Sequence, residues 1–269
     1  MKIWRRCLDA GKMPQGPIRA IVTPIFKSDD KSEPANYRPV SLTNHITKIF
    51  ERVLRKHLVQ HLESQDLMNK SQHGFRDGLS TVTELLSYYD SILSMMEEGH
   101  AVHAIYLDFA KAFDKVDHQI LLTKAKAYGI QGKIHDWIST FLTTRTQQVK
   151  IGEYLSDEVR VLSGVPQGSV LGPVLFIMYM IDITDELEGM EVGSFADDTK
   201  AWQIRQFTFV QRELNKMYRW AEKNNCFQRK EVCESYVWRC HRRNHIPRSR
   251  WQHHQKQNQH KGSWGSNVL

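Results

Sequence analysis

The chain has 269 residues, of which 41% are hydrophobic and 25% are charged, and this balance suits one compact globular body that can be divided into lobes. The net charge of +7 comes from the C-terminal end, where residues 223–269 hold ten Lys/Arg and two Asp/Glu, whereas residues 1–222 hold 27 and 28. Net charge is therefore no evidence that the first 222 residues bind nucleic acid, and only a local groove could provide such a site.

Secretion and membrane insertion are not indicated. Residues 1–6 lack the apolar region of a signal peptide, and Cys7 is the only cysteine before residue 226. The apolar run at 170–183 is too short for a membrane span and contains Pro173. We therefore expect an intracellular protein that has no disulfide framework.

Apolar residues recur at helical spacing in segments 41–64, 80–98 and 132–142. The residues expected on the inner faces are Ile46, Ile49, Phe50, Val53, Leu54 and Leu58 in the first segment, Leu85, Leu86, Tyr89, Ile92, Leu93 and Met96 in the second, and Ile134, Trp137, Ile138 and Phe141 in the third. Residues 147–151 and 159–162 form a predicted hairpin. Together with the strands described next, these helices predict an α+β fold.

The run 101–107 is apolar and rich in β-formers, which is typical of a strand buried on both faces. Asp108 ends this strand, and a carboxylate there either binds a metal or caps a following helix. The local sequence leaves these two alternatives open. Asp114 and Asp117 are expected to be non-catalytic and to cap a helix that ends at Gly129.

The segment 163–169, Ser-Gly-Val-Pro-Gln-Gly-Ser, predicts a loop before a buried helix at 170–183. Its glycines allow a base or sugar to approach the backbone closely, and Gln167 offers an amide. An ordinary tight turn is the alternative.

Two adjacent carboxylates, Asp197 and Asp198, lie at a predicted tight turn between two strands. An isolated pair of this kind is usually a solvated turn, but Asp108 is a second acidic strand end. Carboxylates from separate strands can hold two Mg²⁺ ions about 4 Å apart, an arrangement that suits phosphoryl transfer. The pattern predicts a site for two Mg²⁺ ions, with Mn²⁺ as a substitute, if Asp108 and Asp197 converge.

Ordered motifs give the chain a family resemblance. The segments are Pro24–Lys27, Asn36–Thr43, Gln72–Arg76 with Ser80–Thr81, Leu107–Asp114, Gly164–Pro173 and Phe195–Asp198. In this order they resemble the reverse transcriptase of LINE-type (non-LTR) retrotransposons over roughly residues 20–222. The resemblance implies a right-hand polymerase palm with partial fingers and no thumb.

The resemblance also implies roles for single residues. Asp108, Asp197 and Asp198 match catalytic metal ligands, and Phe113 matches the residue that excludes a ribose 2′-OH, with core packing as the alternative. The residues that match contacts to the incoming nucleotide are Lys27, Arg38, Gln167 and Gly168, with Phe113 beneath the sugar. The implied partners are an RNA template, a DNA primer and deoxynucleoside triphosphates, with no membrane.

The expected organisation has three parts. Residues 1–100 hold partial fingers and the fingers–palm helices, residues 101–222 hold the palm with its carboxylates, and residues 223–269 form a basic tail that is disordered or frameshifted. The cysteines and histidines of this tail match no usual zinc-site spacing. We expect an endonuclease domain to be separate or lost.

The function expected from these features is RNA-directed DNA polymerisation by a fragment of such an element. One alternative is a catalytically inactive remnant that binds RNA non-specifically through its basic tail, and another is a different two-metal enzyme such as a nuclease. If the chain is expressed, the resemblance implies the nucleus or a cytoplasmic ribonucleoprotein as its location.

Overall fold

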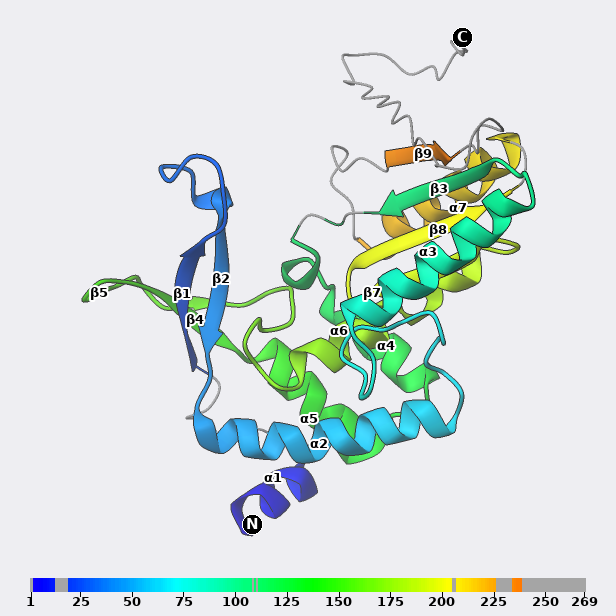
Figure 1. Cartoon of the computed structure of the whole chain (residues 1–269). Coiled ribbons are helices and arrows are strands. Elements are labelled where there is room, and N and C mark those ends of the chain that lie inside the picture. The colour runs from blue at the N-terminus through cyan, green and yellow to red at the C-terminus, as the bar shows by residue number, and fades with distance from the viewer. Residues whose placement is uncertain are drawn as a thin grey trace.

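The computed structural model describes residues 2–12, 19–107, 109, 111–204, 207–225 and 234–238. Two sheets and their surrounding helices form a mixed α+β fold (Figure 1), which confirms the fold class expected from the sequence. Asp108 lies outside the described residues, as do the cysteines and histidines of the tail.

The first sheet has the strand order β2-β1-β4-β5, with β6 paired to β4. Its strands are β1 (Arg19–Phe26), β2 (Tyr37–Leu42), β4 (Thr146–Ile151), β5 (Tyr154–Leu155) and β6 (Val159–Arg160), and η2 (Pro34–Asn36) precedes β2. β1 and β2 are antiparallel, whereas β1 and β4 are parallel. The hairpin predicted for 147–151 and 159–162 is confirmed in part. Gln147 pairs with Val159, but β6 ends at Arg160, and the end of β4 pairs with β5 instead.

The second sheet has the strand order β7-β8-β3-β9, and its pairs are antiparallel. Its strands are β3 (Val102–Leu107), β7 (Glu191–Phe195), β8 (Asp198–Gln203) and β9 (Glu234–Trp238). β9 belongs to the segment for which we expected disorder or a frameshift, yet it forms a strand beside β3. The remainder of the tail beyond residue 225 lies outside the described residues.

Strand β3 is buried on both faces, as its composition predicts. Val102 and Ala104 pack into a cluster with residues of α3 (Thr81–Glu97). Ile105 and Leu107 pack into the main core, to which α7 (Phe207–Lys223) contributes. Because side chains alternate along a strand, these two sets reach opposite faces. Figure 1 accordingly shows α3 in front of this sheet and α7 behind it.

The main core lies where helices from both halves of the chain meet. These elements are α1 (Lys2–Ala10), α2 (His45–Ser64), η3 (Ala112–Asp114), α4 (His118–Ala127), α5 (Gly132–Thr143), α6 (Gly172–Met180) and η4 (Ile181–Glu186). α6 is buried along nearly its whole length, and it packs against α4 and α2. The buried helix predicted at 170–183 is therefore confirmed as α6 with the start of η4. Among the described residues, no helix has the length and apolar character needed to cross a bilayer.

The inner face predicted for α3 is partly wrong. Ile92 and Met96 are buried as expected, but four of the residues assigned to this face, Leu85, Leu86, Tyr89 and Leu93, are exposed. The helix instead turns Glu84 and Tyr88 inward, because these residues have partners on the sheet.

The inner face of α2 is narrower than predicted. Phe50, Leu54 and Leu58 are buried, whereas Ile49 and Val53 are exposed, and the side chain of Ile46 lies outside the described part. On α5, Trp137, Ile138 and Phe141 are buried as predicted, and Ile134 is exposed.

Candidate active site

The two predicted carboxylates lie at the tip of a hairpin. β7 and β8 are joined through Ala196 and Asp197, and Phe195 pairs with Asp198 across the turn. Ala196 has φ 59°, a left-handed conformation that glycine adopts more easily than alanine. Asp197 is half-buried and Asp198 is exposed. We call residues 195–198 the carboxylate turn.

Strand β3 runs beside this hairpin. Its last residue, Leu107, pairs with Thr199, which directly follows Asp198. Asp108 is next to Leu107 in the sequence but lies outside the described residues, so its approach to Asp197 stays a prediction. The prediction requires β3 and β8 to be neighbours in the sheet, and they are paired.

The loop at 163–171 is attached to the segment that follows β3. Gly164 N–H donates to Val116 O at 2.8 Å, and Val165 N–H donates to Phe113 O at 2.8 Å. Gln167 Nε2 donates to Asp114 Oδ1 at 2.9 Å. Two motifs that are separated by about fifty residues in the sequence therefore form one structural unit.

The same loop contacts strand β2 of the first sheet. Ser41 N–H donates to Gln167 O at 2.7 Å. Gly168 has φ 104°, and a β-carbon added there would lie 2.6 Å from Ser41 O, so the contact requires glycine. Arg38 is exposed on this strand, and Lys27 follows β1 with its N–H bonded to Asn36 O at 3.0 Å. The structure thus places Lys27 and Arg38 on the hairpin to which the loop is attached.

Buried polar groups hold both ends of the loop. Glu51 accepts hydrogen bonds from the N–H groups of residues 170 and 171 at 2.7 and 2.9 Å. At the other end, His118 Nε2 and Arg145 Nη2 both bond to Gly164 O, at 2.9 and 3.0 Å. Burial raises the pKa of Glu51 and lowers that of Arg145 to about 10. None of these partners was predicted from the sequence, because each contact spans distant segments.

Phe113 is half-buried and lies within a row of aromatic rings. It stacks on Phe176 with centroids 4.2 Å apart and planes 12° apart, and it meets Phe75 edge-on at 6.3 Å. Phe75 lies in turn 6.5 Å from Phe195 of the carboxylate turn. Core packing, the alternative reading of Phe113, is therefore present, and its role toward a sugar stays a prediction.

Of the two aspartates expected to cap a helix, only Asp117 does so. Asp117 Oδ1 accepts from the N–H groups of Gln119 and Ile120 at 2.8 and 3.0 Å, which caps α4. Asp114 lies in η3 and accepts from Gln167 instead. Burial raises its pKa, and the hydrogen bond from Gln167 opposes this shift. The capping role expected for Asp114 is thus wrong.

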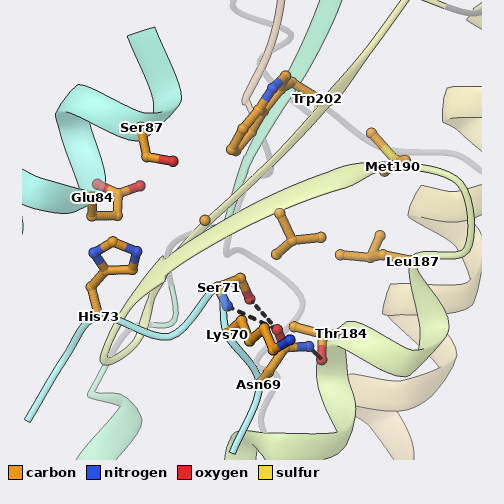
Figure 2. A pocket seen from close by; sticks show the side chains of 12 residues that line it. Asn69, Lys70, Ser71, His73, Glu84, Ser87, Thr184, Leu187, Met190 and Trp202 are labelled. Atoms are coloured by element: carbon orange, nitrogen blue, oxygen red, sulfur yellow. Dashed lines mark hydrogen bonds between the residues drawn. The ribbon is translucent and has the colours of Figure 1, made fainter. Parts of the chain in front are cut away.

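A cavity of about 430 Å³ lies beside strand β7 (Figure 2). It is lined by Asn69, Lys70, Ser71, His73, Glu84, Ser87, Thr184, Leu187, Met190, Val192, Gly193 and Trp202. None of the predicted site residues is among these, so the cavity is separate from the carboxylate turn.

Asp108, one of the three predicted metal ligands, lies outside the described residues. Within the described part of the chain, no group of three His, Cys, Asp or Glu residues is placed to hold a metal ion. The carboxylates of Asp197 and Asp198 are nevertheless oxygen ligands of the kind that Mg²⁺ and Mn²⁺ prefer.

Comparisons of the chain with known proteins agree on one family. The family described as "Reverse transcriptase (RNA-dependent DNA polymerase)" matches residues 25–256, which includes every predicted site residue and β9. The match continues beyond residue 222, where the resemblance recognised in the sequence ends.

Two of the relatives come from mobile elements of Drosophila melanogaster. The probable RNA-directed DNA polymerase from transposon X-element is 36% identical over 183 residues, which are 66% of this chain and 20% of that protein. The RNA-directed DNA polymerase from mobile element jockey is 31% identical over 250 residues, which are 88% of this chain and 27% of that protein. The chain thus spans 20–27% of the length of these relatives.

Among solved structures, the apo telomerase of Candida tropicalis truncated from its C-terminal domain matches with a TM-score of 0.62. The match covers 86% of this chain and 52% of the telomerase chain at 15% identity, so it shows the fold alone. This fold is consistent with the partial right-hand polymerase expected from the motifs.

Proposed function

Because the chain belongs to the reverse transcriptase (RNA-dependent DNA polymerase) family, we propose that it carries the polymerase site of a LINE-type element. In this proposal it adds deoxynucleotides to a DNA 3′-OH on an RNA template. The pairing of β3 with β8 supports it most directly, since it places the strand end before Asp108 beside the carboxylate turn.

Asp108, Asp197 and Asp198 would hold two Mg²⁺ ions, with Mn²⁺ as a substitute. When bound, such ions activate the attacking hydroxyl and neutralise charge on the phosphates. The chain's own contribution is to hold the carboxylate oxygens in a fixed arrangement at the end of a rigid sheet.

The loop and the first sheet would bind the incoming nucleotide. Gln167 and Gly168 would contact the base and sugar, and Phe113 would exclude a 2′-OH. Arg38 and, on the same hairpin, Lys27 would bind the triphosphate, for which the planar guanidinium of arginine is well suited. The bond between Ser41 and Gln167 supports this assignment, because it joins the hairpin to the loop.

The template RNA, the DNA primer and the deoxynucleoside triphosphates are proposed partners. An endonuclease activity would come from another part of the element or from a separate chain. A nuclear or cytoplasmic ribonucleoprotein location is proposed on the resemblance alone.

The test is primer extension by the purified chain on an RNA template with deoxynucleoside triphosphates and Mg²⁺. Asp197→Asn and Asp198→Asn should each lower the rate by about 100-fold or more, the scale for losing a group that stabilises transition-state charge. Asp90→Asn, which changes an exposed aspartate on α3, should leave the rate unchanged and serves as the matched control.

Any other outcome of the primer-extension test supports a different function. Extension that survives Asp197→Asn would reject the proposed metal role, and shortened primers would indicate a nuclease. Absence of extension, together with salt-sensitive RNA binding that is lost when residues 226–269 are removed, would indicate an inactive remnant.

A further inference from the structure

The carboxylate turn contains a backbone conformation that needs support. Ala196 has φ 59° although it carries a β-carbon, and it is buried. Left alone, such a turn would relax toward a commoner conformation. Neighbouring groups must therefore hold it.

The side chain of Gln72 provides this support. Its Oε1 accepts from Ala196 N–H at 2.9 Å, and its Nε2 donates to Ala196 O at 3.3 Å. The same Oε1 accepts from Gly74 N–H at 2.7 Å. Gln72 is itself buried, so its amide replaces the hydrogen bonds that water would otherwise make to the turn.

The backbone around Gln72 is fixed to the same hairpin. Ser194 N–H donates to Ser71 O at 2.9 Å, and His73 N–H donates to Ser194 O at 2.7 Å. These bonds make residues 71–73 a short parallel neighbour of β7, with Gln72 bridged to Ser194. The Gln72 amide is thus held in place before any ligand binds.

Gly74 allows this close approach. A β-carbon added to Gly74 would lie 2.4 Å from Ala196 N and 2.9 Å from Gln72 Oε1. Neither backbone nor a buried amide can move easily to make room. The need for glycine at position 74 is independent evidence that residues 71–74 pack directly against the carboxylate turn.

We propose that Gln72 is a positioning residue that holds the carboxylate turn in the geometry required for metal binding. The inference rests on the proposed function and deepens it. Mg²⁺ requires near-ideal octahedral geometry, so a turn that moves would spread the oxygens of Asp197 and Asp198 and weaken the site. Partners that orient metal ligands in this way typically change metal affinity or activity 10–100-fold when removed.

Gln203 provides a matched control. It is a buried glutamine at the last position of β8, whereas Asp198 is at the first. Its amide has no hydrogen-bond partner among the described residues. Gln72→Met and Gln203→Met make the same chemical change in the same sheet region. Only the first removes bonds to the turn.

The experiment compares the full chain with Gln72→Met, Gln203→Met and Gly74→Ala. Hydrogen–deuterium exchange of peptides covering residues 194–199 reports on the turn, and titration with Mn²⁺ alone reports on the metal site. Gln72→Met and Gly74→Ala should speed exchange in these peptides and raise the half-saturating Mn²⁺ concentration about tenfold or more. Gln203→Met should do neither. Gly74→Ala keeps the test valid if Gln72→Met does not fold.

In primer extension at saturating metal, Gln72→Met and Gly74→Ala should change KM for the nucleotide by a smaller factor than they change the half-saturating Mn²⁺ concentration. Unchanged exchange and unchanged Mn²⁺ binding in both test variants would overturn the inference while leaving the proposed function intact. If the wild-type chain neither binds Mn²⁺ nor extends a primer, the proposed function fails. The inference about metal geometry then fails with it, even where faster exchange shows that Gln72 still holds the turn.

Discussion

Gln167 and Asp114 form a side-chain pair in which Nε2 of the glutamine donates to Oδ1 of the aspartate at 2.9 Å. An ionised carboxylate can only accept hydrogen bonds, so the NH₂ group of Gln167 must face Asp114. The carbonyl Oε1 of Gln167 is therefore directed away from Asp114. The aspartate thus sets which face of the amide is available to a ligand.

Replacing this carboxylate should weaken nucleotide binding. In Asp114→Asn the new amide can donate as well as accept, so the Gln167 amide can turn over. We expect KM for the deoxynucleotide in primer extension to rise about tenfold, the equivalent of losing a hydrogen bond to a charged group. Steady-state kinetics at fixed primer–template concentration measures this change.

Asp117→Asn is the matched control for Asp114→Asn. Asparagine caps helices about as well as aspartate does, so the start of α4 should be retained and KM should be unchanged. If Asp114→Asn also leaves KM unchanged, the orientation of Gln167 does not matter for nucleotide binding.

Replacing Phe113 should relax the choice of sugar. Phe113→Val removes ring atoms that would meet a 2′-OH, and we expect the preference for deoxynucleotides over ribonucleotides, measured as a ratio of kcat/KM values, to fall about tenfold or more. The stack on Phe176 is lost as well, so the free energy of unfolding should also fall, by about 1–3 kcal/mol.

Phe176→Leu separates these two effects. It removes the same stack from the buried side, so it should lower stability without changing the ratio of kcat/KM values. A ratio that changes equally in both variants would mean that Phe113 acts through packing.

The sequence predicted the elements that depend on local pattern. The alternation of Val102, Ala104, Ile105 and Leu107 between two cores is what an apolar β-former run implies, and the Asp-Asp pair does lie at a hairpin turn. Contacts between distant segments were not predictable in this way. Gln72 begins the motif Gln72–Arg76, but the motif does not show which groups the glutamine contacts. Only the structure shows its three hydrogen bonds to the backbone of residues 74 and 196.

Helix α3 shows why the prediction of its buried face was partly wrong. Its sequence offers an apolar stripe through Leu86 and Leu93, and another through Tyr88 and Ile92. Periodicity alone does not decide which stripe meets the sheet. The second one does, because Tyr88 meets Trp202 edge-on at 4.8 Å and the buried Glu84 pairs with a half-buried cation on β8.

That cation, Lys200, should contribute strongly to stability. Its Nζ lies 2.8 Å from Glu84 Oε2, and the Glu84 side chain is only 3% exposed. Lys200→Met leaves a buried carboxylate without its partner, so we expect a loss of about 3 kcal/mol in the free energy of unfolding. Denaturant unfolding followed by circular dichroism measures this loss.

A double-mutant cycle tests the cause. Adding Glu84→Met to Lys200→Met removes the unpaired charge, so most of the stability should return. Lys133→Met, which breaks an exposed pair with Asp9 at 3.7 Å, should cost less than about 1 kcal/mol. Equal losses for Lys200→Met and Lys133→Met would contradict a special role for burial.

His118 should make the loop at 163–171 sensitive to acid. Its Nε2 lies 2.9 Å from Gly164 O, which can only accept, so the ring donates there. Burial lowers the pKa of His118 below its usual value of 6.5. The hydrogen bond to Gly164 opposes this shift, the charge of Arg145 adds to it, and Asp117 opposes it.

Because the pKa of His118 is lowered in the folded state, the direction in which stability changes with pH can be worked out. Between the lowered pKa of the folded state and about 6.5, the unfolded chain binds more protons at this position than the folded chain does, so stability falls as the pH falls through this window. In His118→Gln the amide can still donate to Gly164 O, but it does not titrate. The free energy of unfolding, measured in urea at about pH 7.5 and about pH 5.5, should therefore drop less in His118→Gln than in the wild type. Because the other histidines are common to both proteins, the difference between the two drops isolates His118, and equal drops would show that its folded-state pKa is not lowered.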